Sequence, residues 1–186
     1  IEDGKIGLKE RLTTIQQEVG IGVLPIEIRE LSGGRHVITM TQGSPRLGRR
    51  ITDAQELVQA LSISEDEIGP DQLPVQISST GLDQLMVPLR SLQRAASLVP
   101  NFGKLKDLER HLNVSGCSVF VLKASRPDAE VHVRFFAPSV GVVEDPATGS
   151  AAGALGAYLV AHKVFGPGNP VSFNVEQGLE MQRPSL

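Results

Sequence analysis

A helix built almost entirely from small residues is the feature that most limits how this chain can fold. Between Ala147 and His162 the sequence has three glycines and six alanines, and after Ser150 its first strongly polar side chains are Tyr158 and His162. Each interior glycine costs roughly 1 kcal/mol relative to alanine, so close approach of neighbouring backbone is the expected reason for it. A helix that is apolar on all sides is normally buried. We therefore predict a thin helix enclosed by a β-sheet, with its N-terminal end facing a cleft.

The residues ahead of this helix place carboxylates beside its N-terminus. Residues 131–136 alternate between apolar and other side chains, which predicts a strand, and residues 137–141 break the pattern. Glu144 and Asp145 end the next extended segment. Pro146 suits the first turn of a helix, where its missing N–H costs nothing. Carboxylates beside unpaired backbone N–H groups can both move a proton and hold an anion.

The rest of the chain is predicted to form short strands and helices. Strands are expected over residues 12–16, 23–29, 35–41, 73–78, 82–89, 117–122 and 171–176. Helices are expected from a capping box at residues 52–55 through Leu61, from a shorter capping box at residues 64–67, and over residues 91–98 and 104–112. Residues 32–34 predict a hairpin turn. The loop at residues 42–48 contains two glycines and a proline, which predicts the boundary between two lobes.

Composition excludes several classes of function. The chain has 186 residues and a formal net charge of −3, so nothing predicts general attraction to nucleic acid or to an anionic membrane. A single cysteine, Cys117, excludes an internal disulfide and a cysteine-rich metal site, and we expect a buried, inert thiol. No pair of the four histidines has the spacing of a metal site. No apolar run approaches the roughly 20 residues of a membrane span, so we expect a cytoplasmic protein.

Several motifs, in the same order along the chain, resemble those of the PhzF-like isomerases of phenazine biosynthesis. These motifs are Gln42–Pro45, Ser79–Leu82, Val87–Leu89, Arg134–Pro138 with Gly141, Glu144–Ala151, Gln177–Gly178 and Arg183–Ser185. The resemblance covers essentially the whole chain. It implies an α+β fold of the diaminopimelate-epimerase-like type, in which two mixed β-barrel lobes each wrap a central helix and the active site lies between them. Residues 1–48 would be the remainder of the first lobe, and residues 49–186 would be the second lobe.

The resemblance also implies roles for particular residues. Asp145 would orient the substrate or shuttle a proton, while Ser150 and the backbone N–H of Gly149 would bind a substrate carboxylate. Thr148 would also contact the substrate. It stands where related amino-acid epimerases keep a catalytic cysteine, and threonine is a poor base, so a two-cysteine racemisation is not expected. Gly81, in a Ser-Thr-Gly turn, would approach the substrate. The implied reaction is proton transfer on a small carboxylated substrate by a homodimer, without metal, nucleotide, pyridoxal phosphate or other cofactor.

One departure from the family pattern concerns the other side of the site. The principal acid–base glutamate of the family and the histidine of its Cys-Gly-His motif belong to the first half of the polypeptide. Neither motif occurs in these 186 residues. The chain is therefore expected to hold one side of a two-sided active site.

The same residues also have purely structural interpretations. Asp145 could complement the helix dipole, an effect of roughly 0.3–1 kcal/mol. Ser150 could satisfy a local backbone group, and Gly81 could serve only a tight turn. Glu144 could be either a neighbour of the substrate or a partner for Arg134, and the structural role is the favoured one.

Two other functions remain open at this stage. A chain without the first-half motifs could be a non-catalytic fragment that binds a small molecule or mediates oligomerisation. The glycines at the start of the small-residue helix also resemble the glycine loop of a nucleotide-binding oxidoreductase. Leu155 stands where that loop would need glycine, however, and no phosphate loop is present, so the spacing argues against nucleotide binding.

Overall fold

The computed structural model describes residues 12–166 and 170–186. The chain divides into two compact units, and the division falls between Ser44 and Pro45. This division precedes the boundary expected after Gly48, because residues 46–50 form strand β4 (Arg46–Arg50) and pair with β5 (Gln76–Ser79). The expected loop is therefore present at residues 42–45, whereas residues 46–48 belong to a strand. A Cβ at Gly48 would lie 3.0 Å from Cβ of Ile77, so glycine at this position permits the close approach of the two strands.

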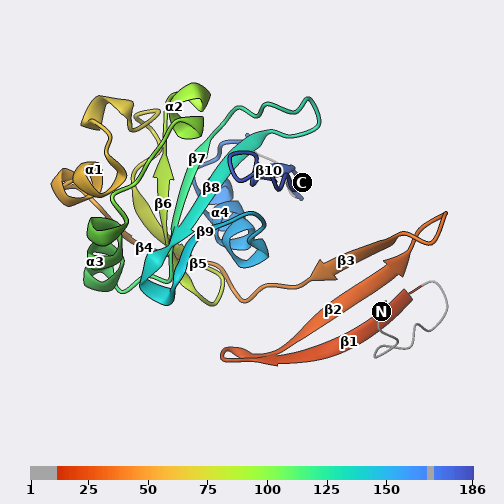
Figure 1. The fold of residues 1–186 in the computed structure, drawn as a ribbon. Helices are drawn as coiled ribbons and strands as arrows, with labels where there is room; N and C mark the ends of the chain where they lie inside the picture. Colours follow the sequence, from red (N-terminus) through yellow and green to blue (C-terminus); the bar gives the residue numbers. More distant parts are fainter. Residues whose placement is uncertain (1–11, 167–169) are drawn as a thin grey trace. The chain divides into compact units, whose positions relative to one another are not determined.

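The smaller unit is an antiparallel sheet of three strands, drawn in red and orange in Figure 1. Its strands are β1 (Leu12–Val19), β2 (Gly22–Glu30) and β3 (His36–Met40). The N–H of Leu31 donates to the carbonyl of Arg35 at 2.7 Å, and Gly33 and Gly34 have φ values of +81° and +72°. The hairpin predicted at residues 32–34 is thus confirmed.

The larger unit is built on a mixed sheet with the strand order β10-β8-β7-β6-β5-β4, and β9 pairs with β8. The remaining strands are β6 (Asp83–Pro88), β7 (Cys117–Val121), β8 (Val131–Ala137), β9 (Val142–Asp145) and β10 (Val175–Gln177). The helices are α1 (Gln55–Leu61), α2 (Leu92–Ala96), α3 (Phe102–Leu112) and α4 (Gly149–Ala161), with short 3-10 helices at Glu65–Glu67 and Pro138–Val140. Pairs β6–β7 and β8–β10 are parallel, and the other pairs are antiparallel. In the part of the chain that the structure describes, no helix is long and apolar enough to cross a membrane.

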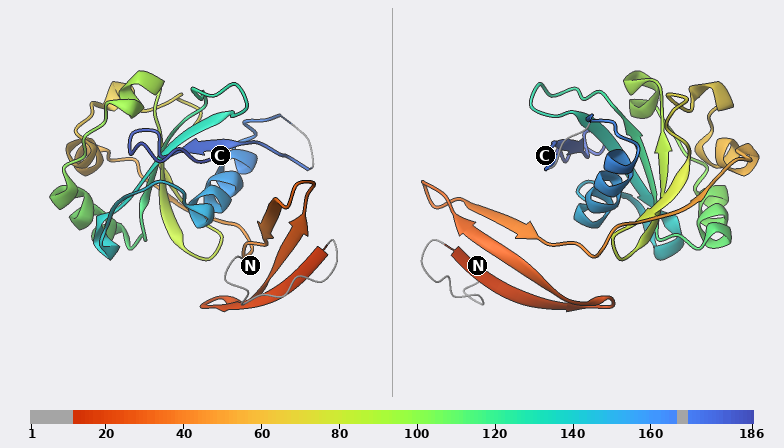
Figure 2. Two further views of the ribbon diagram at one scale, coloured as in Figure 1. Left: turned by 45° about the vertical axis from the view of Figure 1, so that its right-hand side comes forward. Right: turned by 180° about the vertical axis from the view of Figure 1, so that it is seen from behind.

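Alternating side chains divide the core of this unit between the two faces of the sheet. In β6, Leu85 and Val87 join the cluster that α1, α2 and α3 cover, whereas Met86 joins the cluster beneath α4. In β7, Val119 and Phe120 divide in the same way. Figure 2 shows the three shorter helices on one side of the sheet and α4 on the other. The predicted α+β class is confirmed.

Helix α4 packs on the sheet through one side only. Its buried residues are Ala151, Ala154, Leu155, Tyr158 and Leu159. Val160 is 53% exposed, and Gly153 and Gly156 line an open groove of about 440 Å³. Enclosure on all sides was therefore a wrong expectation for the described residues, because the sheet covers only the face that carries Tyr158 and Leu159.

The helix glycines are also less crowded than expected. A Cβ at Gly149 would meet no atom within 4 Å, and one at Gly156 would meet only the ring of Phe173 at 3.7 Å, an ordinary contact distance. Close approach of backbone therefore does not explain these two glycines within residues 12–166 and 170–186.

The local capping signals were right in one case and wrong in the other. The N–H of Ser64 donates to Oε2 of Glu67 at 2.8 Å, so the predicted capping box is present. Helix α1, by contrast, has no capping box from Thr52. Oδ1 of Asp53 accepts the N–H of Gln55 at 3.0 Å instead, and the cap residue makes no side-chain bond.

Gly156→Ala should raise the free energy of unfolding by roughly 0.5–1 kcal/mol, because alanine removes the entropic cost of a helical glycine and its methyl group has room. Denaturant unfolding measures the change. Gly116→Ala is the matched control and should destabilise, since a Cβ there would lie 2.3 Å from the ring of Phe135. A loss of stability in Gly156→Ala would mean that chain outside the described residues packs on this face of α4.

Candidate active site

Asp145 lies where β9 ends and the chain turns toward α4. It pairs with Phe135 of β8, and its side chain is half-buried. The hydroxyl of Thr148 donates to Oδ2 of Asp145 at 2.5 Å. Within the described residues the other carboxylate oxygen, Oδ1, accepts no hydrogen bond. The predicted acid–base group is therefore oriented through one oxygen and open at the other.

The N-terminus of α4 follows directly, but it begins later than the sequence indicated. Thr148 is the cap residue, so Pro146 precedes the helix rather than occupying its first turn. The first N–H that the helix itself satisfies is that of Ala152, which donates to the carbonyl of Thr148 at 3.0 Å. The N–H groups of Gly149 and Ser150 have no partner within the helix, as at any helix N-terminus. Gly149 is exposed, and in the described part of the chain the hydroxyl of Ser150 makes no hydrogen bond.

Gly81 belongs to a different turn, the one that joins β5 to β6. Its φ of +136° is a conformation that favours glycine, and its N–H donates to Oγ of Ser79 at 3.3 Å. Its neighbour Thr80 lines the same groove as Gly153 of α4. The structure thus joins Asp145, Thr148, Gly149 and Ser150 in one turn and places Gly81 outside that turn.

The segment of residues 144–148, here called the acidic turn, is held in place by residues near the C-terminal end of the sequence. Gln177, the last residue of β10, is 4% exposed and donates through Nε2 to the carbonyl of Asp145 at 2.6 Å. Oγ of Ser185 donates to the carbonyl of Pro146 at 2.8 Å. Both residues lie in motifs that carry the family resemblance, but no local pattern indicated that they contact the acidic turn.

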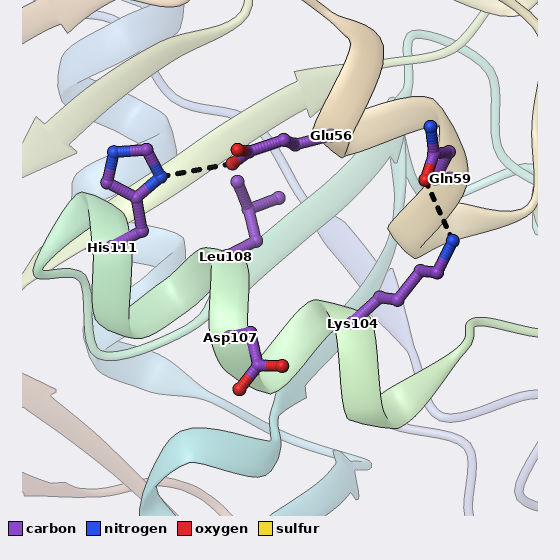
Figure 3. Close-up of a pocket in the computed structure, with 6 residues that line it drawn as sticks. All are labelled: Glu56, Gln59, Lys104, Asp107, Leu108 and His111. Atoms are coloured by element: carbon purple, nitrogen blue, oxygen red, sulfur yellow. Dashed lines mark hydrogen bonds and ion pairs between the residues drawn. The ribbon is translucent and has the colours of Figure 1, made fainter.

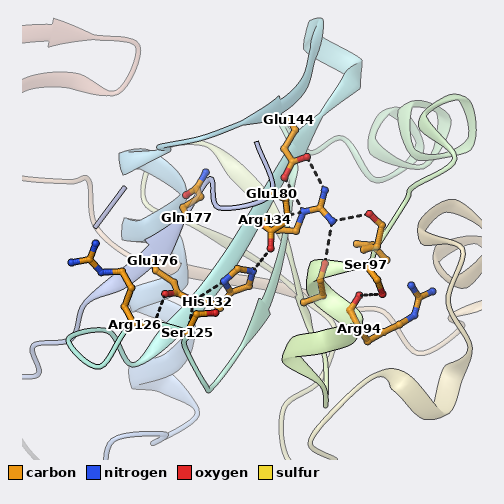
Figure 4. A network of polar contacts seen from close by, with 12 residues as sticks. Arg94, Ser97, Ser125, Arg126, His132, Arg134, Glu144, Glu176, Gln177 and Glu180 are labelled. Carbon is orange, nitrogen blue, oxygen red and sulfur yellow. Dashed lines mark hydrogen bonds and ion pairs between the residues drawn. The ribbon is translucent and has the colours of Figure 1, made fainter. Parts of the chain in front are cut away.

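Glu144, the other carboxylate of the turn, has a structural partner. Its two oxygens accept Nε and Nη2 of Arg134, each at 2.8 Å, in the forked geometry drawn in Figure 4. Nη1 of Arg134 also donates to the carbonyls of Ala95 and Leu98, at 3.1 and 2.7 Å. The structural role favoured for Glu144 is confirmed, and Asp145 remains as the carboxylate available for chemistry.

An ion cluster of His132, Glu176 and Glu180 lies next to Arg134 (Figure 4). His132 is 1% exposed, with Nδ1 2.8 Å from Oε1 of Glu176 and Nε2 3.1 Å from Oε1 of Glu180. The second partner of Glu176 is the backbone, since its carboxylate accepts the N–H groups of Ser125 and Arg126 at 2.6 and 2.9 Å. Sequence patterns could not reveal this cluster, because the partners of His132 follow it by more than forty residues.

Burial and charge act in opposite directions on the pKa values of this cluster. Burial alone would lower the pKa of His132, but Glu180 and Glu176 outweigh it and raise that pKa. Burial would likewise raise the pKa of Glu176, but the two backbone N–H groups and His132 lower it. For Glu180, burial is outweighed by His132, a backbone hydrogen bond and Arg134, so its pKa is lowered. The two carboxylates therefore favour the charged form of the His132 imidazole.

Other candidates for a site are less well supported. A groove of about 280 Å³ between α1 and α3 is lined by six side chains, Glu56, Gln59, Lys104, Asp107, Leu108 and His111 (Figure 3). Exposed pairs bridge it, His111 to Glu56 at 3.0 Å and Lys104 to Gln59 at 2.7 Å, and it contains no residue of the acidic turn. Among the described residues no group of three His, Cys, Asp or Glu could hold a metal ion. Cys117 is buried, which raises its thiol pKa, as expected for an inert cysteine.

Comparisons with known proteins agree with the sequence motifs. The model of the family described as phenazine biosynthesis-like protein (PhzC-PhzF) matches residues 4–186. The chain is 34% identical over 176 residues to the uncharacterized isomerase YfhB of Bacillus subtilis, a match that covers 94% of this chain and 58% of YfhB. It is 32% identical over 169 residues to the trans-2,3-dihydro-3-hydroxyanthranilate isomerase of Pseudomonas fluorescens, covering 91% of this chain and 55% of that enzyme.

A solved structure confirms the predicted fold. The crystal structure of a PhzF-family phenazine biosynthesis protein from Bacillus anthracis superposes with a TM-score of 0.84 and 25% identity, over 99% of this chain and 60% of that protein. The chain thus spans somewhat more than half the length of the relatives that it matches.

The ion cluster makes stability depend on pH in a predictable direction. Because the pKa of His132 is raised from its ordinary value of 6.5, its contribution to the free energy of unfolding is complete below pH 6.5 and is lost as the pH rises through the raised value. Because the pKa values of Glu176 and Glu180 are lowered from 4.5, their contributions are complete above pH 4.5 and are lost as the pH falls through the lowered values. The cluster should therefore stabilise the fold most between pH 4.5 and 6.5.

The measurement compares denaturant unfolding of the natural chain and of His132→Gln. At pH 6 the variant should be less stable by about 3–5 kcal/mol, because two buried carboxylates lose the cation between them. The difference should shrink as the pH rises toward 10. His111→Gln, which removes an exposed pair, is the control and should change stability by less than about 1 kcal/mol. A difference that stays constant with pH would show that His132 is not charged in the folded protein.

Proposed function

The chain belongs to the family of phenazine biosynthesis-like proteins, and on that premise we propose that it supplies the helix-end side of the active site of an isomerase. The reaction is acid/base proton transfer on a small carboxylated substrate. One observation carries the proposal: the turn from β9 to α4 holds an oriented carboxylate directly before a helix N-terminus. A proton acceptor and an anion-binding group therefore lie within a few residues of each other.

The proposed chemistry gives each residue of the turn one task. Asp145 orients the substrate, or shuttles a proton between two of its positions, through the open oxygen Oδ1, so no proton is gained or lost overall. Thr148 holds the other oxygen through its hydroxyl. The N–H groups of Gly149 and Ser150, with the hydroxyl of Ser150, bind the substrate carboxylate, which the positive end of the helix dipole also attracts.

The relatives indicate where a search for the substrate should begin. The Pseudomonas fluorescens relative is named as an isomerase of trans-2,3-dihydro-3-hydroxyanthranilate, which is a carboxylate. We propose this compound as the first of a panel of small cyclic and acyclic carboxylates. Because the chain spans only part of the length of such relatives, every assay uses the natural full-length gene product.

Further features of the proposal concern the whole protein. We propose a cytoplasmic homodimer that needs no metal, nucleotide or other cofactor, with Gly81 approaching the substrate from the β5–β6 turn. Light scattering on a sizing column tests the dimer. A protein that binds the carboxylates without exchanging any of their carbon-bound hydrogens would instead support the alternative of a non-catalytic small-molecule-binding fragment.

Asp145→Asn should lower turnover by about 10²–10⁴, the usual contribution of a positioned acid–base group. The assay follows exchange of carbon-bound hydrogen for deuterium by NMR in D₂O, together with conversion of the substrate. Asp107→Asn, an exposed change on α3, is the matched control and should keep the natural rate. An unchanged rate in Asp145→Asn would remove Asp145 from the mechanism.

Ser150→Ala should mainly weaken binding of the substrate. Loss of one hydrogen bond to a carboxylate, about 1.5–3 kcal/mol, predicts a rise in KM of about 10- to 100-fold with kcat little changed. Ser97→Ala, an exposed serine on the far face of the sheet, is the control. Unaltered affinity in Ser150→Ala would leave Ser150 with a structural role only.

A further inference from the structure

The side chain of Gln177 makes three hydrogen bonds to the acidic turn. Its Nε2 donates to the carbonyl of Asp145 at 2.6 Å and to Oγ1 of Thr148 at 3.0 Å. Its Oε1 accepts the N–H of Thr148 at 3.4 Å. If the amide were flipped, its oxygen would face the carbonyl oxygen of Asp145 and its NH₂ group would face the N–H of Thr148, so neither contact could be a hydrogen bond. The orientation of the amide is therefore set by its partners.

This amide determines where the hydroxyl hydrogen of Thr148 points. A threonine hydroxyl has one hydrogen to donate and lone pairs to accept with. Because Oγ1 of Thr148 accepts from Gln177, its own hydrogen is directed at Oδ2 of Asp145, 2.5 Å away. The donors thus run in one direction, from Gln177 to Thr148 to Asp145.

Gln177 is itself fixed by backbone pairing on both sides. It pairs with Val133 of β8 in parallel register, and it exchanges N–H···O bonds of 3.3 and 2.9 Å with Ser185. The next residue, Gly178, has a φ of +79°, and a Cβ there would lie 2.8 Å from the carbonyl oxygen of Pro146. Glycine therefore lets the chain after β10 pack directly against the acidic turn.

We propose that Gln177 is the positioning residue for the Asp145 carboxylate. It acts through Thr148, and it sets both the rotation of the carboxylate and the oxygen that remains open to substrate. The inference rests on the proposed function, since it assigns a positioning group to the same site. A misplacement of about 1 Å can cost an enzyme a factor of about 100, so an oriented carboxylate needs such a partner.

Two substitutions at Gln177, each with a side chain of similar length, distinguish a positioning role from simple filling of space. Gln177→Met keeps the volume but removes every hydrogen bond to the turn. Gln177→Glu keeps the shape, but its ionised carboxylate only accepts. That carboxylate would face the carbonyl of Asp145 and draw the hydroxyl hydrogen of Thr148 away from Oδ2.

The experiment measures kcat and KM in the natural full-length protein, with the carbon–deuterium exchange assay. Gln177→Met should lower kcat by about 10- to 100-fold and change KM by less than about threefold. Gln177→Glu should lower kcat further, because it also draws the hydroxyl hydrogen of Thr148 away from Asp145.

Thr148→Val and Gln182→Met complete the comparison. Thr148→Val removes the hydroxyl through which Gln177 acts, so it should lower kcat by a factor similar to that of Gln177→Met. Because the two residues act in series, adding Gln177→Met to Thr148→Val should lower kcat little further. Gln182→Met, an exposed glutamine in the same loop, should behave like the natural protein.

The outcomes distinguish this inference from the function on which it rests. If Asp145→Asn leaves turnover unchanged, the proposed function fails, whatever Gln177 does. If Asp145→Asn abolishes turnover but Gln177→Met keeps the natural kcat, the positioning role alone is overturned. A Gln177→Met protein with reduced stability, whose loss of kcat adds in full to that of Thr148→Val, would equally overturn it, since that is the result of a purely structural role.

Discussion

The parallel pairing of β10 with β8 is the constraint on which the rest of this site depends. Its register joins Val175, Glu176 and Gln177 to Val131, His132 and Val133. Because successive side chains of a strand point to opposite faces, Glu176 meets His132 on the face covered by the shorter helices, whereas Gln177 meets the acidic turn beside α4. One short strand therefore supports a buried ion cluster on one face of the sheet and the candidate catalytic turn on the other.

The ion cluster is better explained as an interaction that fixes the register of β10 on β8 than as a source of net stability. Desolvation of buried ions offsets most of their attraction, but removing one partner leaves an uncompensated charge. A slip of β10 by one residue would turn Glu176 away from His132 and Gln177 away from Asp145. The charges on one face thus penalise the slipped pairing that would also dismantle the turn on the other face.

Local sequence patterns predicted much of the fold and part of the site. The alternation in β8, the small residues of α4 and the Asp145-Pro146 turn are signals contained within a few residues. The pattern failed at the start of β4, since the glycines and proline of residues 42–48 indicated a loop although residues 46–50 form a strand that pairs with β5. The sequence pattern also failed to reveal that His132 contacts Glu176 and that Gln177 contacts Asp145, since both contacts depend on pairing between distant segments. Strand β10 is too short to show a period, and it begins at Val175, later than the predicted Val171.

The two hydrogen bonds of the Thr148 hydroxyl limit the kind of proton transfer that this side of the site can support. The hydroxyl hydrogen is donated to Asp145 and the oxygen accepts from Gln177, so the hydroxyl is already engaged on both sides. Under the proposed function Asp145 is then the acid–base group that this turn contributes. A two-cysteine racemisation would need a base at the position of Thr148, and the hydrogen-bond pattern of the turn therefore argues against that reaction.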